Sequence, residues 1–396
     1  MTDSKTVIVS AARTPIGSYG GSLKDVHVTD LGATAIQETV KRAGISSDMV
    51  DYALMGIVVQ AGGGQVAGRT ATVKGGLPVT TGSDTINKAC ASGLRAVTSA
   101  EQMIRCGDVD TAIAGGMENM SRTPYFIRGA KWGLRMGHNQ VEDSMLSDGL
   151  LCPYENVHMI VLGSRLAKRN EISREEQDEW AIRSQQRAGA AIQEGRLKDE
   201  TVPVFIPQRK GDPKVFDTDE FPRPDTTLEK LAKLPPAMVP DGTVTAGNAP
   251  GVNDGAATLL LMSEGKAKTL GLKPLATIVS HISTAAKVDQ LDTGVTNAVL
   301  QLLEKNKLTP GDVGLYEVNE AFAAVTLAVI RNADLDPDRV NVNGGAIAFG
   351  HPVGATGARI LMTLIYEMRR RGEELGVAAI CSGQSQGDAV LVRIES

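Results

Sequence analysis

Three of the residues that could carry out covalent chemistry lie in segments of small residues that contain glycine. Cys90 lies in the segment 87–93, His351 follows the glycine-rich segment 343–350, and Cys381 begins the triplet Cys-Ser-Gly. The chain has only four cysteines and five histidines, so it places its possible nucleophiles and bases where backbone can approach a ligand closely. A cysteine and a histidine are expected of a covalent nucleophile and its proton-transfer partner, provided that the three segments meet in the fold.

Cys90 opens a segment of small apolar residues that runs to Ile104 and that we expect to form a buried helix. A thiolate at a helix N-terminus is stabilised by the helix dipole and by free backbone N–H groups. The thiolate is also the form that accepts an acyl group. The alternative is a buried structural cysteine, which is how we interpret Cys106 and Cys152.

His351 and Cys381 are the residues that could transfer protons during catalysis. His351 stands between a Phe-Gly pair and Pro352, in a turn that we expect to expose its imidazole. A neutral imidazole can take the proton of a thiol, and its Nε2–H could instead donate to a thioester oxygen. Cys381 ends an apolar strand, and Gly383 could bring its N–H close to a reacting carbonyl, as an oxyanion hole requires. A second thiol near the first would be either a redox pair or an acid/base, and the sequence leaves both open.

Asn319 and Glu320 lie between the apolar residues Val318 and 321–323. Buried polar side chains need hydrogen-bond partners. Asn319 could therefore hold a water that donates to an oxyanion. The alternative is that Asn319 caps a helix.

The elements that must position these residues follow an α/β order that occurs twice. In the first half we expect a strand at 6–11, followed by a helix that is capped by Asp30 and ends at Gly44. The helix that begins at Cys90 and a second strand at 109–114 follow. A similar order returns roughly 260–270 residues later, as strands at 276–280 and 377–381 and helices at 297–305 and 358–370. We interpret this as a duplication of two α/β halves, with chance similarity as the alternative.

Residues 121–250 interrupt the repeat. They hold both tryptophans and one clear helix start, the capping box Ser173–Glu176. A long insertion with mixed apolar and basic residues is typical of a substrate-binding lid, and the alternative is an oligomerisation flap.

Length and composition limit the class of protein. With 396 residues the chain exceeds one ordinary core, so two or three domains are expected. The net charge of −5 argues against nucleic acid as the main partner, although a local basic patch could still bind a polyphosphate. The four separated cysteines suit neither a disulfide framework nor a zinc site, and neither a signal-peptide pattern nor a membrane-spanning run is visible. We expect a cytoplasmic protein that spans no membrane.

Together these motifs resemble the thiolase family, and within it the acetyl-CoA acetyltransferases. The resemblance covers the whole chain and depends on the segment around Cys90 and on the segments 115–121, 243–249, 319–322 and 344–357. It implies a thiolase fold with duplicated halves in a five-layered α-β-α-β-α arrangement and an inserted lid. The implied domains are an N-terminal half (1–120 plus 250–272), a loop domain for CoA binding and oligomerisation (121–249), and a C-terminal half (273–396).

The resemblance also implies a role for each site residue. Cys90 would attack a thioester and carry the acyl group, while His351 takes its proton and later forms an oxyanion hole with a water held by Asn319. Cys381 would remove a proton from the α-carbon of a second acetyl-CoA. The N–H groups of Cys90 and Gly383 would form the other oxyanion hole. The implied reaction is a reversible Claisen condensation of two acetyl-CoA to acetoacetyl-CoA and CoA, with ping-pong kinetics.

Coenzyme A would bind as the thioester substrate, with no tightly bound cofactor, no metal and no nucleic acid. The resemblance places its adenine beside Arg223 and its pantetheine beside His158 and Met159, although Arg223 could instead be a solvated surface charge. The other candidates for CoA binding are Ala246, Ala249 and Phe322. The resemblance further implies a homotetramer, a dimer of dimers.

The chain departs from the family pattern in three places. Gln384 and Ser385 stand where glycines are usual, Pro250 stands where a serine often contacts pantetheine, and the run 160–165 is unusual. Non-glycine residues at 384 and 385 would be strained if the loop needs positive φ there.

Three rival functions remain on the sequence alone. A degradative 3-ketoacyl-CoA thiolase would share the fold and the triad and differ only in the size of its acyl pocket. A non-catalytic acyl-CoA-binding protein on a thiolase scaffold would bind CoA without activity. A thiol redox protein would use Cys90 and Cys381 as a pair.

Overall fold

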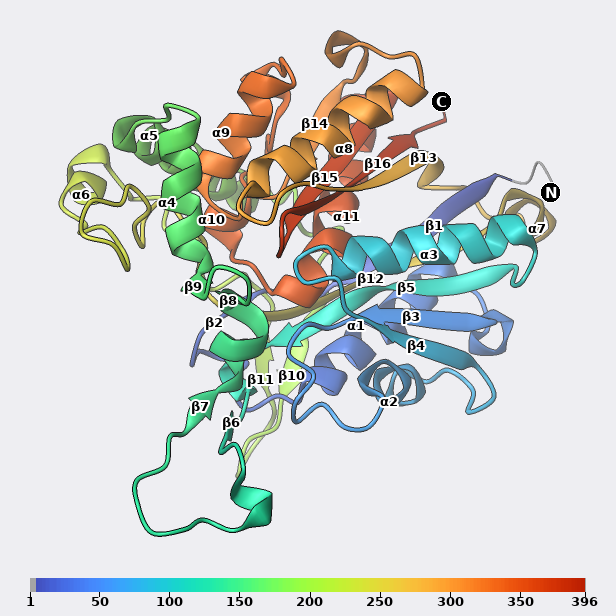
Figure 1. Ribbon diagram of the computed structural model, residues 1–396. Helices are drawn as coiled ribbons and strands as arrows, with labels where there is room; N and C mark the ends of the chain where they lie inside the picture. Colours follow the sequence, from blue (N-terminus) through green and yellow to red (C-terminus); the bar gives the residue numbers. More distant parts are fainter. Residues whose placement is uncertain (1–4, 396) are drawn as a thin grey trace.

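The computed structural model describes residues 5–395, which form layers of helices around one large sheet (Figure 1). The order of the sheet is β14-β15-β16-β13-β1-β12-β5-β3-β4, with β2 paired to β12. Its strands are β1 (Thr6–Arg13), β2 (Gly17–Ser18), β3 (Tyr52–Gly56), β4 (Gly82–Ile86), β5 (Thr111–Asn119), β12 (Asn253–Ser263), β13 (Ala276–Ala285), β14 (Leu315–Val318), β15 (Leu375–Ser382) and β16 (Gln386–Arg393). Because β1 pairs with both β12 and β13, the two halves of the chain share one continuous sheet.

Five layers result because this sheet has two arms with helices between them and outside them. The helices α3 (Ser92–Cys106) and α11 (Val353–Arg371) pack together between the arms, and one apolar core joins them to strands of both. The outer helices of the first arm are α1 (Val28–Ala43) and α2 (Ala67–Lys74), and those of the second arm are α8 (Leu291–Lys305) and α9 (Ala323–Asn332). The predicted five-layered α-β-α-β-α fold is confirmed.

The first predicted helix is confirmed at its end but not at its start. α1 begins two residues before Asp30, and its N-cap is His27, whose Nδ1 accepts a hydrogen bond from the N–H of Thr29. Asp30 lies in the first turn, where a carboxylate interacts favourably with the helix dipole. Gly44 ends the helix in the left-handed conformation, with φ of 66°.

The two central helices also differ from their predicted starts. The helix predicted over 358–370 begins already at Val353, and the helix predicted to open at Cys90 begins at Ser92. Gly357 does not break α11, because it is the point where this helix meets α3: an added Cβ there would lie 2.4 Å from the backbone nitrogen of Leu94. Gly357, which follows the predicted turn at His351, therefore allows α11 and α3 to touch.

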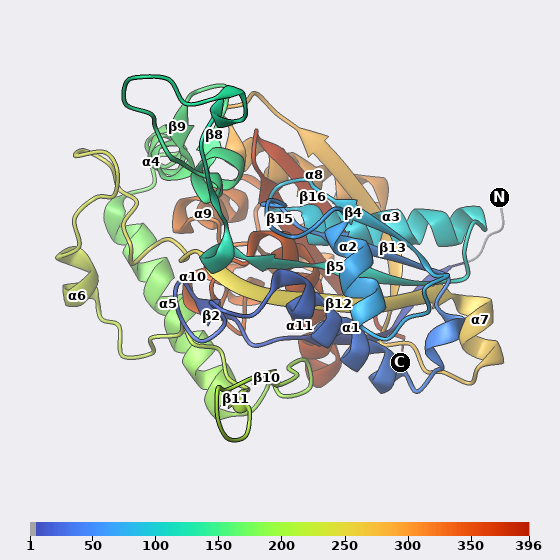
Figure 2. The same cartoon turned by 90° about the horizontal axis from the view of Figure 1, so that it is seen from below.

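The insertion carries helices and short strands that lie outside the main sheet (Figure 2). They are η2 (Met120–Arg122), β6 (Tyr125–Phe126), η3 (Ala130–Trp132), β7 (Glu142–Asp143), η4 (Met145–Leu150), β8 (Leu151–Cys152), β9 (Val157–His158), α4 (Met159–Arg169), α5 (Arg174–Gln193), β10 (Val204–Ile206), β11 (Lys214–Phe216) and α6 (Leu228–Ala232). Between β6 and β7 the chain extends away from the body as an open loop. The helices α4 and α5 pack against α9, and α5 begins with the predicted capping box of Ser173 and Glu176.

The short helices that complete the described chain are η1 (Ser47–Met49), α7 (Glu264–Thr269), η5 (Pro310–Asp312), η6 (Pro337–Arg339) and α10 (Ala346–Phe349). α10 lies directly before His351 and packs against α5 of the insertion. Glu320 strengthens this junction, because its buried carboxylate accepts hydrogen bonds from Trp180 Nε1 and Ser184 Oγ on α5. No helix within residues 5–395 is both long enough and apolar enough to cross a membrane.

Candidate active site

The Cys90 and His351 segments meet where α3 and α11 begin. An added Cβ on Gly93 would lie 2.8 Å from the carbonyl oxygen of Gly354, so only glycine permits this approach of the two backbones. Cys90 packs in the same small apolar cluster as Val252, and Val252 forms an isolated β-bridge with His351. These contacts bring the cysteine of the first half and the histidine of the second half to one place.

The Cys381 segment reaches the same place as a hairpin. β15 ends at Ser382, whose Oγ donates to the carbonyl oxygen of Lys88 at 2.5 Å. Lys88 in turn forms a 2.6 Å ion pair with Asp388 on β16. This double attachment fixes the hairpin against the loop that carries Cys90, and an added Cβ on Gly383 would lie 3.2 Å from the Cβ of Ala89.

The surroundings of Cys90 favour its thiol form. The backbone N–H groups of Cys90 itself and of Gly383 lower its pKa by hydrogen bonding to the sulfur. Desolvation has the larger effect and raises the pKa of Cys90 to about 11, although the residue as a whole is only half-buried. The stabilisation expected from backbone N–H groups is thus present but smaller than the effect of desolvation, and Cys90 needs a base when it reacts.

His351 is held as a neutral imidazole with a defined tautomer. Its Nδ1 lies 2.7 Å from Thr356 Oγ1, and that hydroxyl donates to the carbonyl oxygen of Pro352 at 2.9 Å. We assign the one hydroxyl proton of Thr356 to the Pro352 carbonyl, so that Nδ1 donates to Oγ1 and Nε2 keeps its lone pair. Burial, with a smaller effect from Arg359, lowers the pKa of His351 to about 3. Nε2 is buried and has no hydrogen-bond partner in the described part of the chain, so it is available to accept a proton. The expectation of an exposed imidazole is wrong, since His351 is buried.

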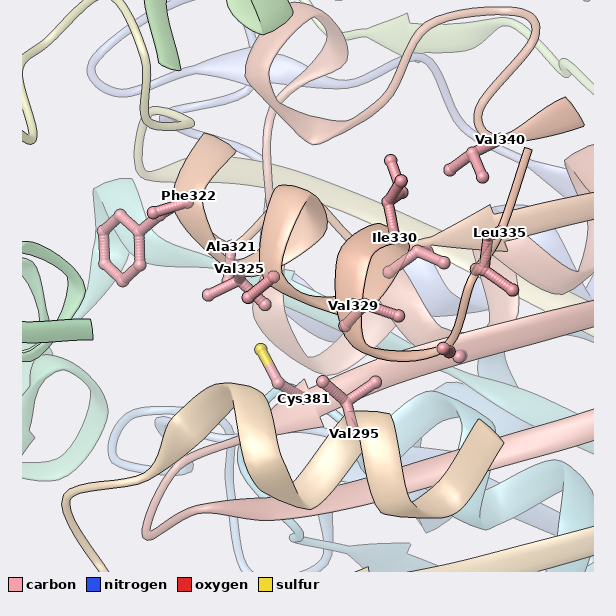
Figure 3. Close-up of a cluster of buried hydrophobic side chains, with 14 of the residues drawn as sticks. Val295, Ala321, Phe322, Val325, Val329, Ile330, Leu335, Val340 and Cys381 are labelled. Atoms are coloured by element: carbon pink, nitrogen blue, oxygen red, sulfur yellow. The ribbon is translucent and has the colours of Figure 1, made fainter. Parts of the chain in front are cut away.

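Asn319 and Cys381 lie at the carboxyl ends of two adjacent parallel strands, β14 and β15. β14 and β15 pair through Val318 and Ala379, so Asn319 and Cys381 follow that pair at the same edge. Both residues are buried, and the Cys381 sulfur points toward the beginning of α9, near Ala321 (Figure 3). Burial, and then the nearby Cys90, raise the pKa of Cys381 well above its usual value.

The side-chain amide of Asn319 is buried and has no hydrogen-bond partner among residues 5–395. An amide in that position needs a water or a ligand atom. The alternative that Asn319 caps a helix is wrong, because the N-cap of α9 is Phe322 and no side chain caps that helix.

Three supporting residues were missed by the sequence reasoning. Asn253 accepts the backbone N–H of His351 at 2.9 Å, and Thr356 orients the imidazole ring. Glu118 accepts three backbone N–H groups, those of Val58 (2.9 Å), Val59 (3.2 Å) and Gly354 (3.0 Å). Burial raises the pKa of Glu118 to about 7 in spite of these hydrogen bonds. A glutamate inside the buried run 111–119 was the available signal, since a buried carboxyl group needs donors.

Arg223 is exposed and packs on one aromatic residue, Phe221. Its guanidinium lies 5.5 Å from the centre of the Phe221 ring, and its backbone N–H donates to Gln185 at 2.7 Å. An added Cβ on Gly251 would lie 2.7 Å from the Phe221 ring. Gly251 precedes Val252, the residue that forms the bridge with His351.

Of the five other CoA candidates, three share an apolar cluster with Cys381, and His158 and Ala246 lie outside it. Met159, Ala249 and Phe322 belong to the apolar cluster that also contains Cys381. His158 caps α4 by accepting the N–H of Ile160. Ala246 is exposed in the loop after Val244, and the described contacts do not bring it into that cluster.

Gln384 and Ser385 both adopt positive φ, of 64° and 57°. The loop therefore needs the conformation that favours glycine, and the departure from the family pattern does place strained residues there. Ser385 is buried while Gln384 is exposed.

Known proteins resemble this chain over nearly its whole length. The family models described as "Thiolase, N-terminal domain" and "Thiolase, C-terminal domain" match residues 6–265 and 272–394. The acetyl-CoA acetyltransferase of Chromobacterium violaceum is 48% identical over 98% of this chain and 99% of its own length. That of Pseudomonas aeruginosa is 49% identical over 97% of this chain and 98% of its own. The crystal structure of the Bacillus anthracis acetyl-CoA acetyltransferase superposes with a TM-score of 0.96 at 42% identity, covering 98% of each chain. The chain belongs to the thiolase family.

Proposed function

We propose that this thiolase catalyses the reversible Claisen condensation of two acetyl-CoA molecules to acetoacetyl-CoA and CoA. The names of its full-length relatives support acetyl-CoA as the substrate. The observation that carries the chemistry is that Cys90 and His351 meet at Val252, with the Nε2 of His351 buried and without a hydrogen-bond partner among the described residues. We assign the catalytic roles to Cys90, His351, Cys381, Asn319 and the N–H of Gly383.

The first half-reaction forms acetyl-Cys90. The thiol proton moves to His351 Nε2 while the sulfur bonds to the thioester carbonyl carbon, and the N–H groups of Cys90 and Gly383 donate to the oxyanion. The C–S bond to CoA then breaks, and the CoA thiolate takes the proton from His351. Because the pKa of Cys90 is high, transfer of its proton during the attack on the thioester is more favourable than formation of a free thiolate before the attack.

The second half-reaction forms the carbon–carbon bond. Cys381 gives its proton to His351, and the resulting thiolate removes a proton from the α-carbon of the second acetyl-CoA. His351 Nε2–H and a water held by Asn319 donate to the enolate oxygen, the enolate attacks acetyl-Cys90, and the released Cys90 sulfur takes the proton back from His351. A thiol of high pKa suits this role, because its thiolate is a strong base and its thiol is the proton donor in the thiolytic direction.

For CoA binding we propose that Arg223 lies beside the adenine, with Phe221 behind the guanidinium. We propose His158 and Met159 beside the pantetheine, and Ala249 and Phe322 as the apolar surface leading toward Cys381. Ala246 belongs to this proposal on the family resemblance alone. No tightly bound cofactor is needed for the reaction as written.

We also propose that the chain divides into an N-terminal half (1–120 with 250–272), a loop domain (121–249) and a C-terminal half (273–396). We further propose a homotetrameric assembly and a cytoplasmic location. Sedimentation or light scattering of the purified protein tests the assembly. A dimer or monomer at micromolar concentration would contradict it.

A thiolysis assay across chain lengths tests the substrate. We expect higher kcat/KM for acetoacetyl-CoA than for 3-ketooctanoyl-CoA, and none above background in Cys90→Ala. A preference for the longer chain would support the degradative 3-ketoacyl-CoA thiolase instead. CoA binding without turnover of either substrate would support the non-catalytic acyl-CoA-binding protein.

A further inference from the structure

A cationic cavity that none of the proposed catalytic or CoA-binding residues line lies between α5, the segment 336–343 and the last turn of α11. Its volume is about 410 Å³. Arg187, Arg196 and Arg371 line it, with Asp338 as the only lining carboxylate among the described residues. None of these residues has a role in the proposed reaction.

The three arginines are held in place by a few protein contacts. Arg187 Nη1 donates to the carbonyl oxygens of Val340 (2.6 Å) and Asn341 (3.3 Å). Arg196 bonds to Glu194 and donates Nη1 to Asn343 Oδ1 at 2.9 Å. Arg371 bonds to Glu367 through Nε alone, so its two Nη groups have no hydrogen-bond partner in the described chain. The cavity thus contains positioned donors beyond those that the protein uses.

Positive charge exceeds negative charge around the cavity. Arg183 and Arg370 join the three lining arginines, and the carboxylates of Asp338, Glu367 and Glu194 are the partners of all five. The side chain of Asp338 is 81% exposed, so solvent screens its contribution. This excess of cations is unusual on a chain whose net charge is −5.

The pKa of Arg187 is lowered mainly by burial and in smaller part by repulsion from neighbouring cations. Burial, followed by the positive charges of Arg183 and Arg371, lowers the pKa of Arg187 to about 10, against the opposing effect of Asp338 and Glu320. An anion in the cavity would relieve this repulsion and partner the open donors of Arg371.

We propose that this cavity binds a phosphate group, either as free phosphate or as part of a nucleotide. The planar guanidinium donates two parallel hydrogen bonds to phosphate oxygens, which suits phosphate better than a spherical anion. The volume admits a phosphate with its waters or a phosphate that carries a nucleoside. Bound phosphate would also hold together α5 and the segment 340–343, which leads into α10 and His351.

Isothermal titration with sodium phosphate tests the proposal, with sodium chloride keeping the ionic strength constant and CoA absent. The main variant is Gln186→Glu, because Gln186 lines the cavity and is exposed, so the change adds a negative charge without disturbing the core. Its control is Gln301→Glu, the same change at an exposed position of α8. A second pair is Arg371→Gln with Arg369→Gln, since Arg369 bonds to the carbonyls of Pro274 and Leu275 and does not line the cavity.

We expect saturable phosphate binding to the wild-type protein and a rise in Tm that chloride does not produce. Gln186→Glu and Arg371→Gln should weaken binding at least tenfold, and both controls should stay within twofold. A parallel titration with AMP separates the sources: tighter binding than phosphate, lost in Gln186→Glu, indicates a nucleotide, and equal or weaker binding indicates free phosphate. Absence of saturable binding, or equal binding by Gln186→Glu, would refute the proposal. Because Cys90→Ala should bind phosphate normally, this result is independent of the proposed reaction.

Discussion

Thr356 determines which nitrogen of His351 carries the ring proton. The Nδ1–Oγ1 distance is 2.7 Å, and Thr356 Oγ1 also lies 2.9 Å from the carbonyl oxygen of Pro352, to which we assign the hydroxyl proton. His351 lies two residues before α11 and Thr356 lies in the first turn of that helix, and the assignment leaves Nε2 as an acceptor. The proposed base therefore depends on a residue that does not touch the substrate.

We first predict that Thr356→Val lowers kcat by roughly tenfold to a hundredfold and changes the KM for acetoacetyl-CoA little, because a positioning partner of a general base is lost. Valine keeps the shape but leaves a buried Nδ1–H without an acceptor, which costs about 1–3 kcal/mol of stability. Thr356→Ser keeps the hydroxyl and should restore most of kcat. Steady-state kinetics with both variants checks this, and equal loss in Ser and Val would contradict the tautomer argument.

A second prediction concerns the reactivity of the free enzyme. Since the pKa of Cys90 is raised to about 11, its thiolate fraction should rise about tenfold for each pH unit between pH 7 and 10. The rate of iodoacetamide alkylation, followed on the Cys90 peptide by mass spectrometry, should rise in the same way. A rate already at its plateau at pH 7 would show a stabilised resting thiolate instead.

Glu118 gives a third prediction, on stability against pH. Its pKa is raised from 4.5 to about 7 in the folded protein, so the folded state binds the proton more tightly than the unfolded state. The contribution of Glu118 is then complete below pH 4.5 and is lost as pH rises through 7, by on the order of 3 kcal/mol. Denaturant unfolding from pH 5 to 8 should show this fall in the wild type and a flatter profile in Glu118→Gln. Parallel profiles would contradict it.

Gln384 supports a fourth prediction, on backbone strain. Its φ of 64° costs a non-glycine residue about 1–2 kcal/mol, while glycine loses about 0.5–1 kcal/mol more entropy on folding. Gln384→Gly should therefore raise the free energy of unfolding by up to about 1 kcal/mol. The β-branched change Gln384→Val should lower it, because such residues are outliers at positive φ. Chemical denaturation compares the two, and a Val variant as stable as the Gly variant would exclude strain.

The sequence predicted the fold well where local patterns decide the structure. The capping box at Ser173 and the Gly44 helix end depend on neighbours within a few residues, and both are confirmed. The start of α11 was predicted too late, because glycine-rich segments usually form turns, and only packing against α3 reveals that Gly354 and Gly357 lie in a helix.

Parts of the site depended on contacts between distant segments. Glu118 and Gly354 are 236 positions apart, so their hydrogen bond has no local signal. The pKa of Cys90 likewise depends on how much protein surrounds the sulfur, and the expected effect of a helix N-terminus was smaller than desolvation. The residue types and the glycine spacing indicated which residues lie together in the site. The protonation states of these residues could be inferred only from the structure.

Identifying the residue that carries the acetyl group is the strongest test of the proposed mechanism. The protein is incubated with acetyl-CoA, quenched in acid and digested, and each cysteine peptide is examined by mass spectrometry, with Cys90→Ala and Cys381→Ala alongside. We predict acetyl on Cys90 in the wild type and in Cys381→Ala, with acetoacetyl-CoA formed by the wild type only. Acetyl on another cysteine, or a Cys90–Cys381 disulfide with no acetyl at all, would contradict the proposed mechanism.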